Sequence, residues 1–339
     1  MKTLVIEKPK MITVKEAETP VPEEGETLLK MVVGGICGSD LGVYRGTMAY
    51  GAYPRIPGHE FAAEIVKING DPMGFTEGQI VTANPYFNCG HCYSCRRGFV
   101  NCCTDNRTMG VQRDGAFSQY FVMPTKRLID GGGLPPETLA LIEPFCISYH
   151  GIKRANVKEG ETVLVIGGGT IGILALFAAK TRGARVYVCD VSQNKLDKAL
   201  EFGADGVILN DSPETLQKKV EELTAGNGFD VTVEAVGLPS TFQNAVDAAA
   251  YRARIVLVGI SKRPLDFAFN VIQQKELNIM GSRNAFTEDF KELIELVKIQ
   301  DIGIERVITN QYKFSDAARA FKEFDENQGS MLKVLIRFI

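Results

Sequence analysis

The arrangement of hydrophobic and polar residues changes along the chain near residue 145. Before about residue 130, short apolar or alternating runs such as residues 27–33 and 61–66 are separated by Gly and Pro. Short runs of this kind, bounded by turn residues, are typical of strands. The first part of the chain is therefore expected to form a small β-rich domain or barrel.

From about residue 145, apolar strands alternate with longer amphipathic stretches. Helices are expected at residues 194–202 and 212–223, the second with Ser212 as N-cap and Pro213 at its first position. The expected strands are residues 163–166, 185–189, 207–209, 231–234 and 255–258. Strands and helices that alternate in this way predict a doubly wound parallel sheet, and hence an α/β protein.

The last part of the chain, from about residue 286, contains two helical patterns and a strand. The helices are expected at residues 289–299 and 315–323, and the closing strand at residues 333–336. The chain has 339 residues, more than one hydrophobic core usually supports, so two domains are expected.

Composition narrows the class of protein. Hydrophobic residues make up 45% of the chain and charged residues 23%, which is ordinary for a globular enzyme. The net charge is only −3 and there is no dense run of Lys or Arg, so nucleic acid is not an expected partner. The sequence also shows no secretion signal and no apolar run of about 18 to 20 residues, so a cytoplasmic protein without a membrane partner is expected.

A glycine fingerprint follows the strand at residues 163–166. The strand leads into G-x-G-x-x-G and then into the helical run 173–180. The three glycines allow a tight turn, close approach of a pyrophosphate, and close packing of the helix on the strand. The expected cofactor-binding residues are Gly167, Gly169, Thr170, Ile171, Gly172, Asp190 and Lys195.

Asp190, at the end of the next strand, indicates which dinucleotide is bound. A carboxylate there accepts hydrogen bonds from two ribose hydroxyls and repels a 2′-phosphate. The following Val191 and Ser192 supply no Arg that would reverse this preference. NAD is therefore favoured over NADP. Cys189, beside Asp190, is interpreted as a small buried strand residue.

Four closely spaced cysteines predict a structural zinc site. Cys89, Cys92, Cys95 and Cys103 have the spacing C-x2-C-x2-C-x7-C. Four thiolates complete a tetrahedral zinc and leave no open position, which marks a structural site. Cys102 competes for the fourth place, but Cys103 gives the commoner spacing. His91, which lies between the first two cysteines, is interpreted as a solvated residue.

A second set of potential zinc ligands is scattered along the chain: Cys37, His59, Glu60 and Glu143. A catalytic zinc takes three protein ligands and keeps one position for water or substrate. Their spacing alone allows other interpretations, namely a core thiol, a turn histidine and surface carboxylates.

The order and spacing of these motifs resemble those of zinc-dependent medium-chain alcohol and polyol dehydrogenases. The resemblance rests on Cys37-Gly-Ser-Asp, Gly58-His59-Glu60, the four cysteines, Glu143-Pro144 and the glycine fingerprint, and spans essentially the whole chain. It implies a GroES-like β-barrel catalytic domain of residues 1–145 and 283–339, and a Rossmann NAD-binding domain of residues 146–282. It further implies an alcohol dehydrogenase of the EC 1.1.1 type, with one catalytic zinc, one structural zinc and NAD, forming a homodimer or homotetramer.

The resemblance also implies roles for individual residues. Cys37 and His59 are similar to the family's zinc ligands. Glu60 and Glu143 are similar to the two carboxylates that, in the sorbitol and threonine dehydrogenase branches, share the remaining coordination directly or through water. Alcohol dehydrogenases proper often have Cys in place of Glu143, which favours the polyol side of the family.

Two further residues match positions that handle protons in the family. Ser39 resembles the hydroxyl that takes the substrate proton, and Asp40 resembles the acceptor that holds the imidazole of His59. Many members have His five residues after the first Cys, as a proton exit to solvent. This chain has Gly42 there, so its proton route beyond Ser39 is open.

Three segments suggest the substrate. Residues 140–145, 147–148 and 281–285 resemble bacterial L-gulonate and L-galactonate 5-dehydrogenases. Arg283 lies where polyol dehydrogenases place an Arg that meets substrate hydroxyls, and its guanidinium could pair with a sugar-acid carboxylate. The alternative is a surface salt bridge, and Arg113 is a second candidate. A neutral polyol such as sorbitol, L-threonine, or a non-catalytic sensing role on the same fold are the alternative functions.

Overall fold

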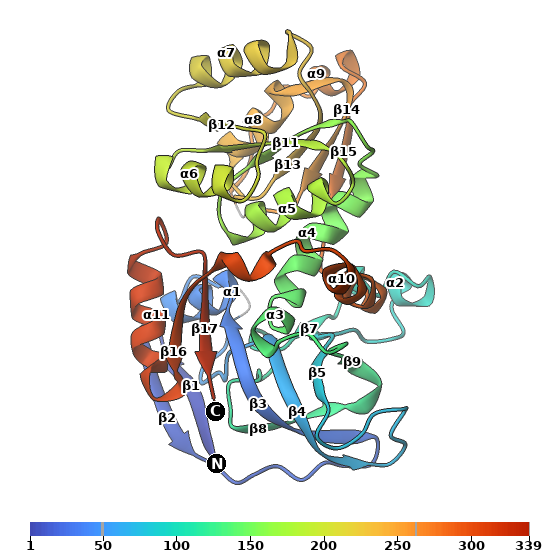
Figure 1. Ribbon diagram of the computed structural model, residues 1–339, viewed down its shortest axis with the longest axis vertical. Helices are drawn as coiled ribbons and strands as arrows, with labels where there is room; N and C mark the ends of the chain where they lie inside the picture. The colour runs from blue at the N-terminus through green and yellow to red at the C-terminus, as the bar shows by residue number, and fades with distance from the viewer. Residues whose placement is uncertain (49–50, 262, 339) are drawn as a thin grey trace. The chain divides into compact units, whose positions relative to one another are not determined.

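The computed structural model describes residues 1–48, 51–261 and 263–338 (Figure 1). The chain forms two compact units, one of Met1–Glu143 with Ala285–Ile339 and one of Pro144–Asn284. The sequence placed these two divisions after residue 145 and before residue 283. Among the described residues, no helix is both long and apolar enough to span a membrane.

The first unit is built on a β-sheet that joins both ends of the chain. In the described residues this sheet has seven strands in the order β16-β17-β3-β4-β5-β9, with β8 also paired to β3. The strands are β3 (Glu26–Ile36), β4 (Glu60–Asn69), β5 (Ile80–Ala83), β8 (Tyr120–Pro124), β9 (Leu128–Asp130), β16 (Ile308–Lys313) and β17 (Lys333–Arg337). Because β17 pairs with β3 in antiparallel register, Val334 opposite Ile36, the last segment of the chain completes the sheet begun by the first.

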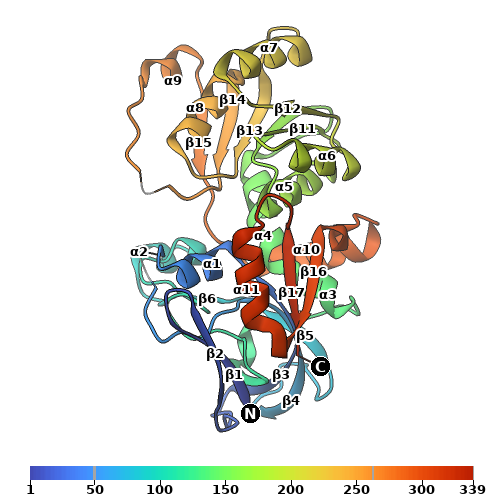
Figure 2. The same cartoon turned by 90° about the vertical axis from the view of Figure 1, so that its left-hand side faces the viewer.

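Shorter elements surround this sheet. Two small antiparallel sheets are formed by β1 (Lys2–Lys8) with β2 (Met11–Glu16) and by β6 (Tyr86–Phe87) with β7 (Arg107–Thr108). The helices are α1 (Gly38–Arg45), α2 (Tyr93–Arg96), α3 (Pro136–Leu139), α10 (Thr287–Ile299) and α11 (Ala317–Glu326). Figure 2 shows α11 beside β16 and β17, which it contacts.

The core of the first unit lies between the sheet and these elements. Phe61 packs edge-to-face against Phe121, with ring centroids 5.1 Å apart, and Phe117 does so against Phe321 of α11 at 6.4 Å. Rings in this geometry contribute about 0.5–1.5 kcal/mol beyond their buried area. The second contact therefore attaches α11 to the segment that precedes β8.

The second unit contains a six-stranded parallel sheet in the order β12-β11-β10-β13-β14-β15, within the part of the chain that the structure describes. Its strands are β10 (Thr162–Ile166), β11 (Arg185–Asp190), β12 (Gly206–Leu209), β13 (Phe229–Glu234), β14 (Ala249–Leu257) and β15 (Asn278–Gly281). Its helices are α5 (Thr170–Lys180), α6 (Gln193–Glu201), α7 (Pro213–Thr224), α8 (Pro239–Asp247) and α9 (Asn270–Gln274), and α4 (Ile142–Ala155) begins at the unit boundary. The strand order reverses between β10 and β13, and ligands of such sheets bind at that reversal.

Most expected elements of the second unit are present. The predicted N-cap of α7 is confirmed, because the Ser212 hydroxyl accepts a hydrogen bond from the Thr215 N–H at 3.1 Å. Some details differ from the sequence prediction, since α6 ends at Glu201 rather than Phe202 and β14 begins at Ala249 rather than Ile255. Val258 lies beyond the end of β14, and β15 was not expected. The short β15 sequence, Asn-Ile-Met-Gly, carries too little periodicity to identify it.

Candidate metal centres and dinucleotide site

The four predicted structural ligands lie together in the first unit. The Sγ atoms of Cys89, Cys92, Cys95 and Cys103 are all within 4.8 Å of one another, and those of Cys92 and Cys103 are 4.0 Å apart. A tetrahedral zinc with bonds of about 2.3 Å would set its sulfurs roughly 3.8 Å apart. The backbone N–H groups of Cys89 and Cys92 already donate to sulfurs of the group, at 3.2 and 3.3 Å. This set of sulfurs fits a closed zinc site.

The structure separates the ligands from their competitors. Cys103 is buried in the group, whereas Cys102 is exposed outside it. His91 is also exposed, with Nδ1 3.0 Å from the Cys89 carbonyl oxygen. Hydrogen bonds from backbone N–H groups, the first from Thr104, lower the pKa of Cys92, while burial raises the pKa of Cys103. Zinc binding at this site would therefore have to release a proton from Cys103.

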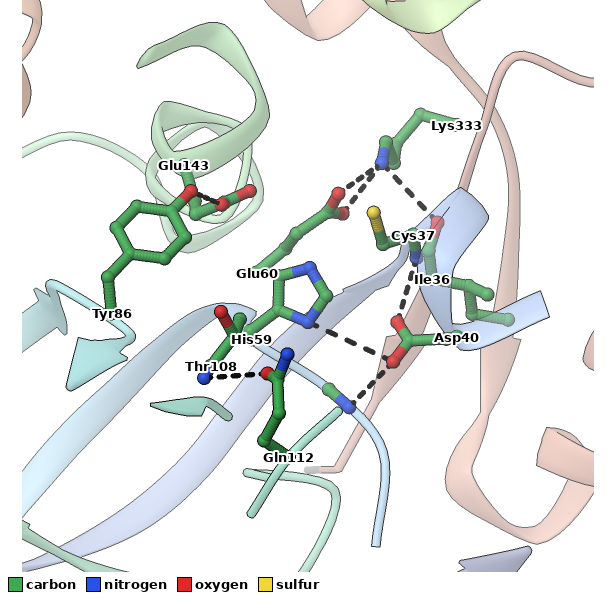
Figure 3. A network of polar contacts seen from close by, with 11 residues as sticks. Ile36, Cys37, Asp40, His59, Glu60, Tyr86, Thr108, Gln112, Glu143 and Lys333 are labelled. Carbon is green, nitrogen blue, oxygen red and sulfur yellow. Dashed lines mark hydrogen bonds and ion pairs between the residues drawn. The ribbon is translucent and has the colours of Figure 1, made fainter. Parts of the chain in front are cut away.

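A second group of potential ligands lies where β3 and β4 meet (Figure 3). Ligand atoms of Cys37, His59 and Glu60 are within 4.8 Å of one another. Cys37 follows the last residue of β3 and Glu60 is the first residue of β4, and the register that places Gly35 opposite Glu60 brings them together. A side chain at Gly35 would collide with the Glu60 carboxylate. Three ligands of these types leave room for a fourth, which matches an open site.

Asp40 ties the two ligand-bearing segments together. Its carboxylate accepts hydrogen bonds from the Cys37 N–H at 2.9 Å and from the Gly58 N–H at 3.1 Å. The nearest approach to the His59 imidazole is 3.9 Å, from Oδ1 to Nδ1, which is longer than a hydrogen bond. The expected role of Asp40 in holding that ring stays a prediction, and its observed contacts are with the backbone.

The electrostatics of this group favour a cation. Burial lowers the pKa of His59, but the nearby Cys37 and Asp40 raise it by more, so it lies well above its usual value. Metal ligands must lose such protons when a metal binds. The His59 Nδ1 and the Ser39 Oγ are both buried without a hydrogen-bond partner, and such atoms cost about 1–3 kcal/mol each. A bound zinc and a polar substrate at this group would suit both observations.

The glycine fingerprint in the second unit has the conformation that a dinucleotide requires. Gly167 has a φ of +106°, and a side chain at Gly172 would collide with the Gly167 carbonyl oxygen. Gly169 caps α5 without any side-chain hydrogen bond, and the space where its Cβ would lie is empty to 4 Å. The N-terminus of α5, with Thr170 and Ile171, is therefore open to an anion.

Asp190 lies beside this turn. Its Oδ2 accepts a hydrogen bond from the Gly168 N–H at 2.7 Å and its Oδ1 from the Ser192 N–H at 2.9 Å, while Lys195 Nζ is 3.8 Å from Oδ2. Each carboxylate oxygen can accept a second bond. The geometry thus fits an Asp190 that is held by the backbone and can still accept from ribose hydroxyls.

Comparison with known proteins agrees with this geometry. The model of the alcohol dehydrogenase GroES-like domain matches residues 23–135, and that of the zinc-binding dehydrogenases matches residues 170–298. L-Galactonate-5-dehydrogenase of Escherichia coli K12 is 33% identical over 338 residues, covering 100% of this chain and 99% of the relative. The chain is a zinc-type alcohol dehydrogenase. The predicted family, fold and enzyme class are confirmed.

Other relatives of this dehydrogenase have varied names. The starvation-sensing protein RspB of E. coli K12 is 36% identical over 348 residues, covering 100% of this chain and 99% of the relative. The solved structure of RspB from E. coli CFT073, in complex with NADH, has a TM-score of 0.92 at 35% identity and covers 100% of this chain and 99% of its own. Sorbitol dehydrogenase of Halalkalibacterium halodurans is 31% identical over 95% of this chain and 94% of its own.

Two residues near the group of Cys37, His59 and Glu60 were missed by sequence reasoning. Lys333 is buried, and its Nζ lies 2.7 and 2.6 Å from the two Glu60 oxygens and 3.3 Å from the Ile36 carbonyl oxygen. Tyr86 donates its hydroxyl proton to Glu143 (Figure 3). The only sequence signal was for Lys333, a charged residue at the start of an apolar strand.

The two expected carboxylate ligands of the dehydrogenase therefore differ in their surroundings. Glu60 is paired with Lys333 and groups with Cys37 and His59, whereas Glu143 is hydrogen-bonded to Tyr86 outside the 4.8 Å group. Burial raises the pKa of Glu143 to about 7. Each carboxylate keeps lone pairs that its present partner does not use, so either could still offer an oxygen to zinc.

The two arginine candidates of the dehydrogenase occupy different settings. Arg283 is exposed and follows β15 in the second unit. Arg113, in the first unit, stacks on Phe87 with its Cζ 3.6 Å from the ring centroid. A cation in this position is already stabilised by the aromatic ring. Both arginines are exposed, so their settings alone do not decide which of them meets a substrate carboxylate.

Proposed function

We propose that the enzyme transfers a hydride from a secondary alcohol of a sugar acid, a hexonate such as L-gulonate or L-galactonate, to NAD. The observation that carries the proposal is the open group of Cys37, His59 and Glu60. Ser39, two residues after Cys37, has a buried hydroxyl without a hydrogen-bond partner. A full-length relative named for L-galactonate supports the substrate class.

The residues of the first unit divide the work of the alcohol oxidation. Cys37, His59 and one of the carboxylates Glu60 and Glu143 would hold a zinc ion, which supplies Lewis-acid polarisation of the substrate oxygen. Ser39 Oγ would accept the hydroxyl proton of the alcohol while it passes its own proton on toward solvent, so that the serine stays neutral. The carbon-bound hydrogen leaves as hydride, so that the products are a ketone, NADH and a proton.

Asp40 and Lys333 position these groups. Asp40 holds the Cys37 and Gly58 backbones at fixed separation through its two oxygens. Lys333 neutralises Glu60 in the buried site. We infer that this pairing keeps Glu60 ionised, so that its carboxylate would be available to hold zinc together with Cys37 and His59.

The choice of NAD rests on Asp190. Its carboxylate would repel the 2′-phosphate of NADP, and it accepts the Gly168 N–H of the phosphate-binding turn at 2.7 Å. Lys195, 3.8 Å from Asp190, would lie near the same ribose. The cofactor-binding residues we propose are those expected from the sequence.

Arg283 is proposed to bind the substrate carboxylate. It is exposed, and a guanidinium pairs with a carboxylate through two parallel hydrogen bonds. A neutral polyol such as sorbitol and L-threonine are the alternative substrates, and relatives named for each cover most of the chain. A non-catalytic sensing role is favoured only by the name of RspB, whereas the grouped Cys37, His59 and Glu60 support catalysis.

Substrate profiling tests the proposal. NADH formation should be measured by absorbance with a panel of hexonates and neutral polyols and with L-threonine, using zinc-loaded protein. Arg283→Ala should raise KM for the hexonate about tenfold or more and leave KM for the matching polyol within about twofold, because only the acid offers a carboxylate. Arg113→Ala is the matched control and should change neither KM.

Two results would contradict the proposed substrate. Equal increases in both KM values for Arg283→Ala would remove its carboxylate role, and activity on polyols with none on any hexonate would overturn the substrate class.

We also propose that the enzyme acts in the cytoplasm as a homodimer or homotetramer. Light scattering after gel filtration would measure its mass.

A further inference from the structure

Glu234, at the end of β13, is a buried carboxylate that belongs neither to the zinc-binding groups nor to the cofactor-binding residues proposed above. Glu234 is only 3% exposed. Its Oε1 accepts three hydrogen bonds, from the Val236 N–H at 2.9 Å, the Gly237 N–H at 2.8 Å and the Thr241 hydroxyl at 2.7 Å. Three donors on one oxygen hold the side chain in a single orientation. The position of the other oxygen is therefore determined as well.

This second oxygen, Oε2, accepts no hydrogen bond from the residues that the structure describes, and it is not among the fully buried polar atoms. Two glycines border it. A side chain at Gly259 would collide with Oε2 and with the Gly237 backbone, and Gly237 itself has a φ of +86°. Both positions thus require glycine, and its absence of a side chain leaves Oε2 accessible.

The strand order places Oε2 relative to the cofactor. In the parallel sheet, Ile166 of β10 is level with Cys189 of β11 on one side and with Glu234 of β13 on the other. Asp190 and Glu234 therefore end the two strands that flank the glycine fingerprint. A dinucleotide lies across this reversal of strand order, with its adenosine half on the side of Asp190. Its nicotinamide half consequently lies on the side of Glu234.

Direct packing supports this placement. The Ala235 N–H donates to the Ile166 carbonyl oxygen at 2.9 Å, and the Val236 side chain lies 2.7 Å from where a Cβ of Gly167 would be. The segment held by Glu234 is thus in contact with the phosphate-binding turn. A ligand on that turn would pass close to Oε2.

We propose that Glu234 Oε2 accepts a hydrogen bond from a hydroxyl of the ribose in the nicotinamide half of the cofactor. Glu234 would then serve this ribose as Asp190 serves the adenosine ribose. The inference rests on the proposed use of NAD, and it adds a cofactor-positioning residue that the glycine fingerprint does not include.

Glu234→Gln separates the two roles of the side chain. The Gln oxygen can still accept from Val236, Gly237 and Thr241, whereas an NH₂ group replaces Oε2. Calorimetry should measure the Kd of NADH and of ADP, which carries no second ribose. NADH should bind about tenfold more weakly to the variant, because a charged acceptor is lost, while the Kd of ADP should stay within about twofold. Asp190→Asn is the matched control and should weaken both ligands.

The wild-type protein supplies an independent measurement. ADP-ribose, which carries the second ribose but no nicotinamide, should bind about tenfold more tightly than ADP. Equal affinities of ADP-ribose and ADP would overturn the contact, as would equal weakening of NADH and ADP by Glu234→Gln, or no weakening of either. A wild-type protein that binds neither NADH nor ADP would overturn the proposed NAD function itself.

Discussion

The two potential zinc sites in the first unit are built in opposite ways. The four-cysteine group (Cys89, Cys92, Cys95 and Cys103) comes from one continuous loop, whereas the open group (Cys37, His59 and Glu60) joins two strands of the sheet. Three of the four cysteines are half-buried, while His59 and Glu60 are buried. A loop can therefore form the first site by itself, but only the folded sheet assembles the second.

The two groups also differ in the polar and charged residues around them. Four sulfurs leave a zinc no open position, so the four-cysteine group can only hold its loop in shape. The open group is instead bordered by Lys333, whose ammonium lies 2.6 Å from Glu60, and by Ser39, whose buried hydroxyl has no partner. A hydroxyl without a partner and a carboxylate held by an ion pair can both form new contacts, as a site that binds and releases substrate requires. The following variants test this division, beginning with the largest effect.

Cys37→Ala should abolish catalysis without unfolding the protein. Loss of one of three ligands should empty the open site, and losing the Lewis acid should lower kcat/KM about a thousandfold or more. Elemental analysis should find one zinc per chain, and NADH absorbance measures the rate. Activity near wild type with a single zinc would show that the open group is not the catalytic site.

The sequence predicted these two groups to different extents, for physical reasons. The four-cysteine spacing is local, so it predicted all four cysteines that the fold brings together, and the exposure of Cys102 agrees with the choice of Cys103. The glycine fingerprint is equally local. Lys333 and Glu60 are 273 residues apart, and nothing in either local pattern reveals that pairing. Tyr86 escaped notice for the same reason, since its partner Glu143 is 57 residues away. The hydrogen bonds of Glu234 are local, but only the completed sheet places it beside the glycine fingerprint.

Lys333→Met should destabilise the protein severely. It leaves the Glu60 carboxylate buried without its counter-charge, and breaking such a pair costs about 3–5 kcal/mol. Urea unfolding followed by circular dichroism measures the loss. Lys333→Arg, which keeps the charge, is the control and should recover most of the stability. A decrease in the free energy of unfolding of less than about 1 kcal/mol would contradict this, because it would show that Glu60 does not need the charge of Lys333.

Cys103→Ser should affect stability and leave catalysis nearly intact. One zinc per chain should be lost, and the free energy of unfolding should fall by several kcal/mol, because loss of a structural metal is among the changes with the largest costs. The kcat/KM of the folded fraction should stay within about tenfold of wild type, because the open group is unchanged. A thousandfold loss of kcat/KM in protein that remains folded would show that the four-cysteine group, too, is needed for catalysis.

Cys102→Ser is the matched variant and should have the smallest effect. Cys102 neighbours Cys103 in sequence but is exposed outside the group of four sulfurs. Exposed substitutions away from specific contacts usually change stability by less than about 0.5 kcal/mol. Two zinc ions per chain should therefore be retained, with unchanged urea unfolding. Loss of one zinc in this variant, but not in Cys103→Ser, would assign the fourth ligand to Cys102, because the zinc content of each variant reports directly on which sulfur coordinates the metal.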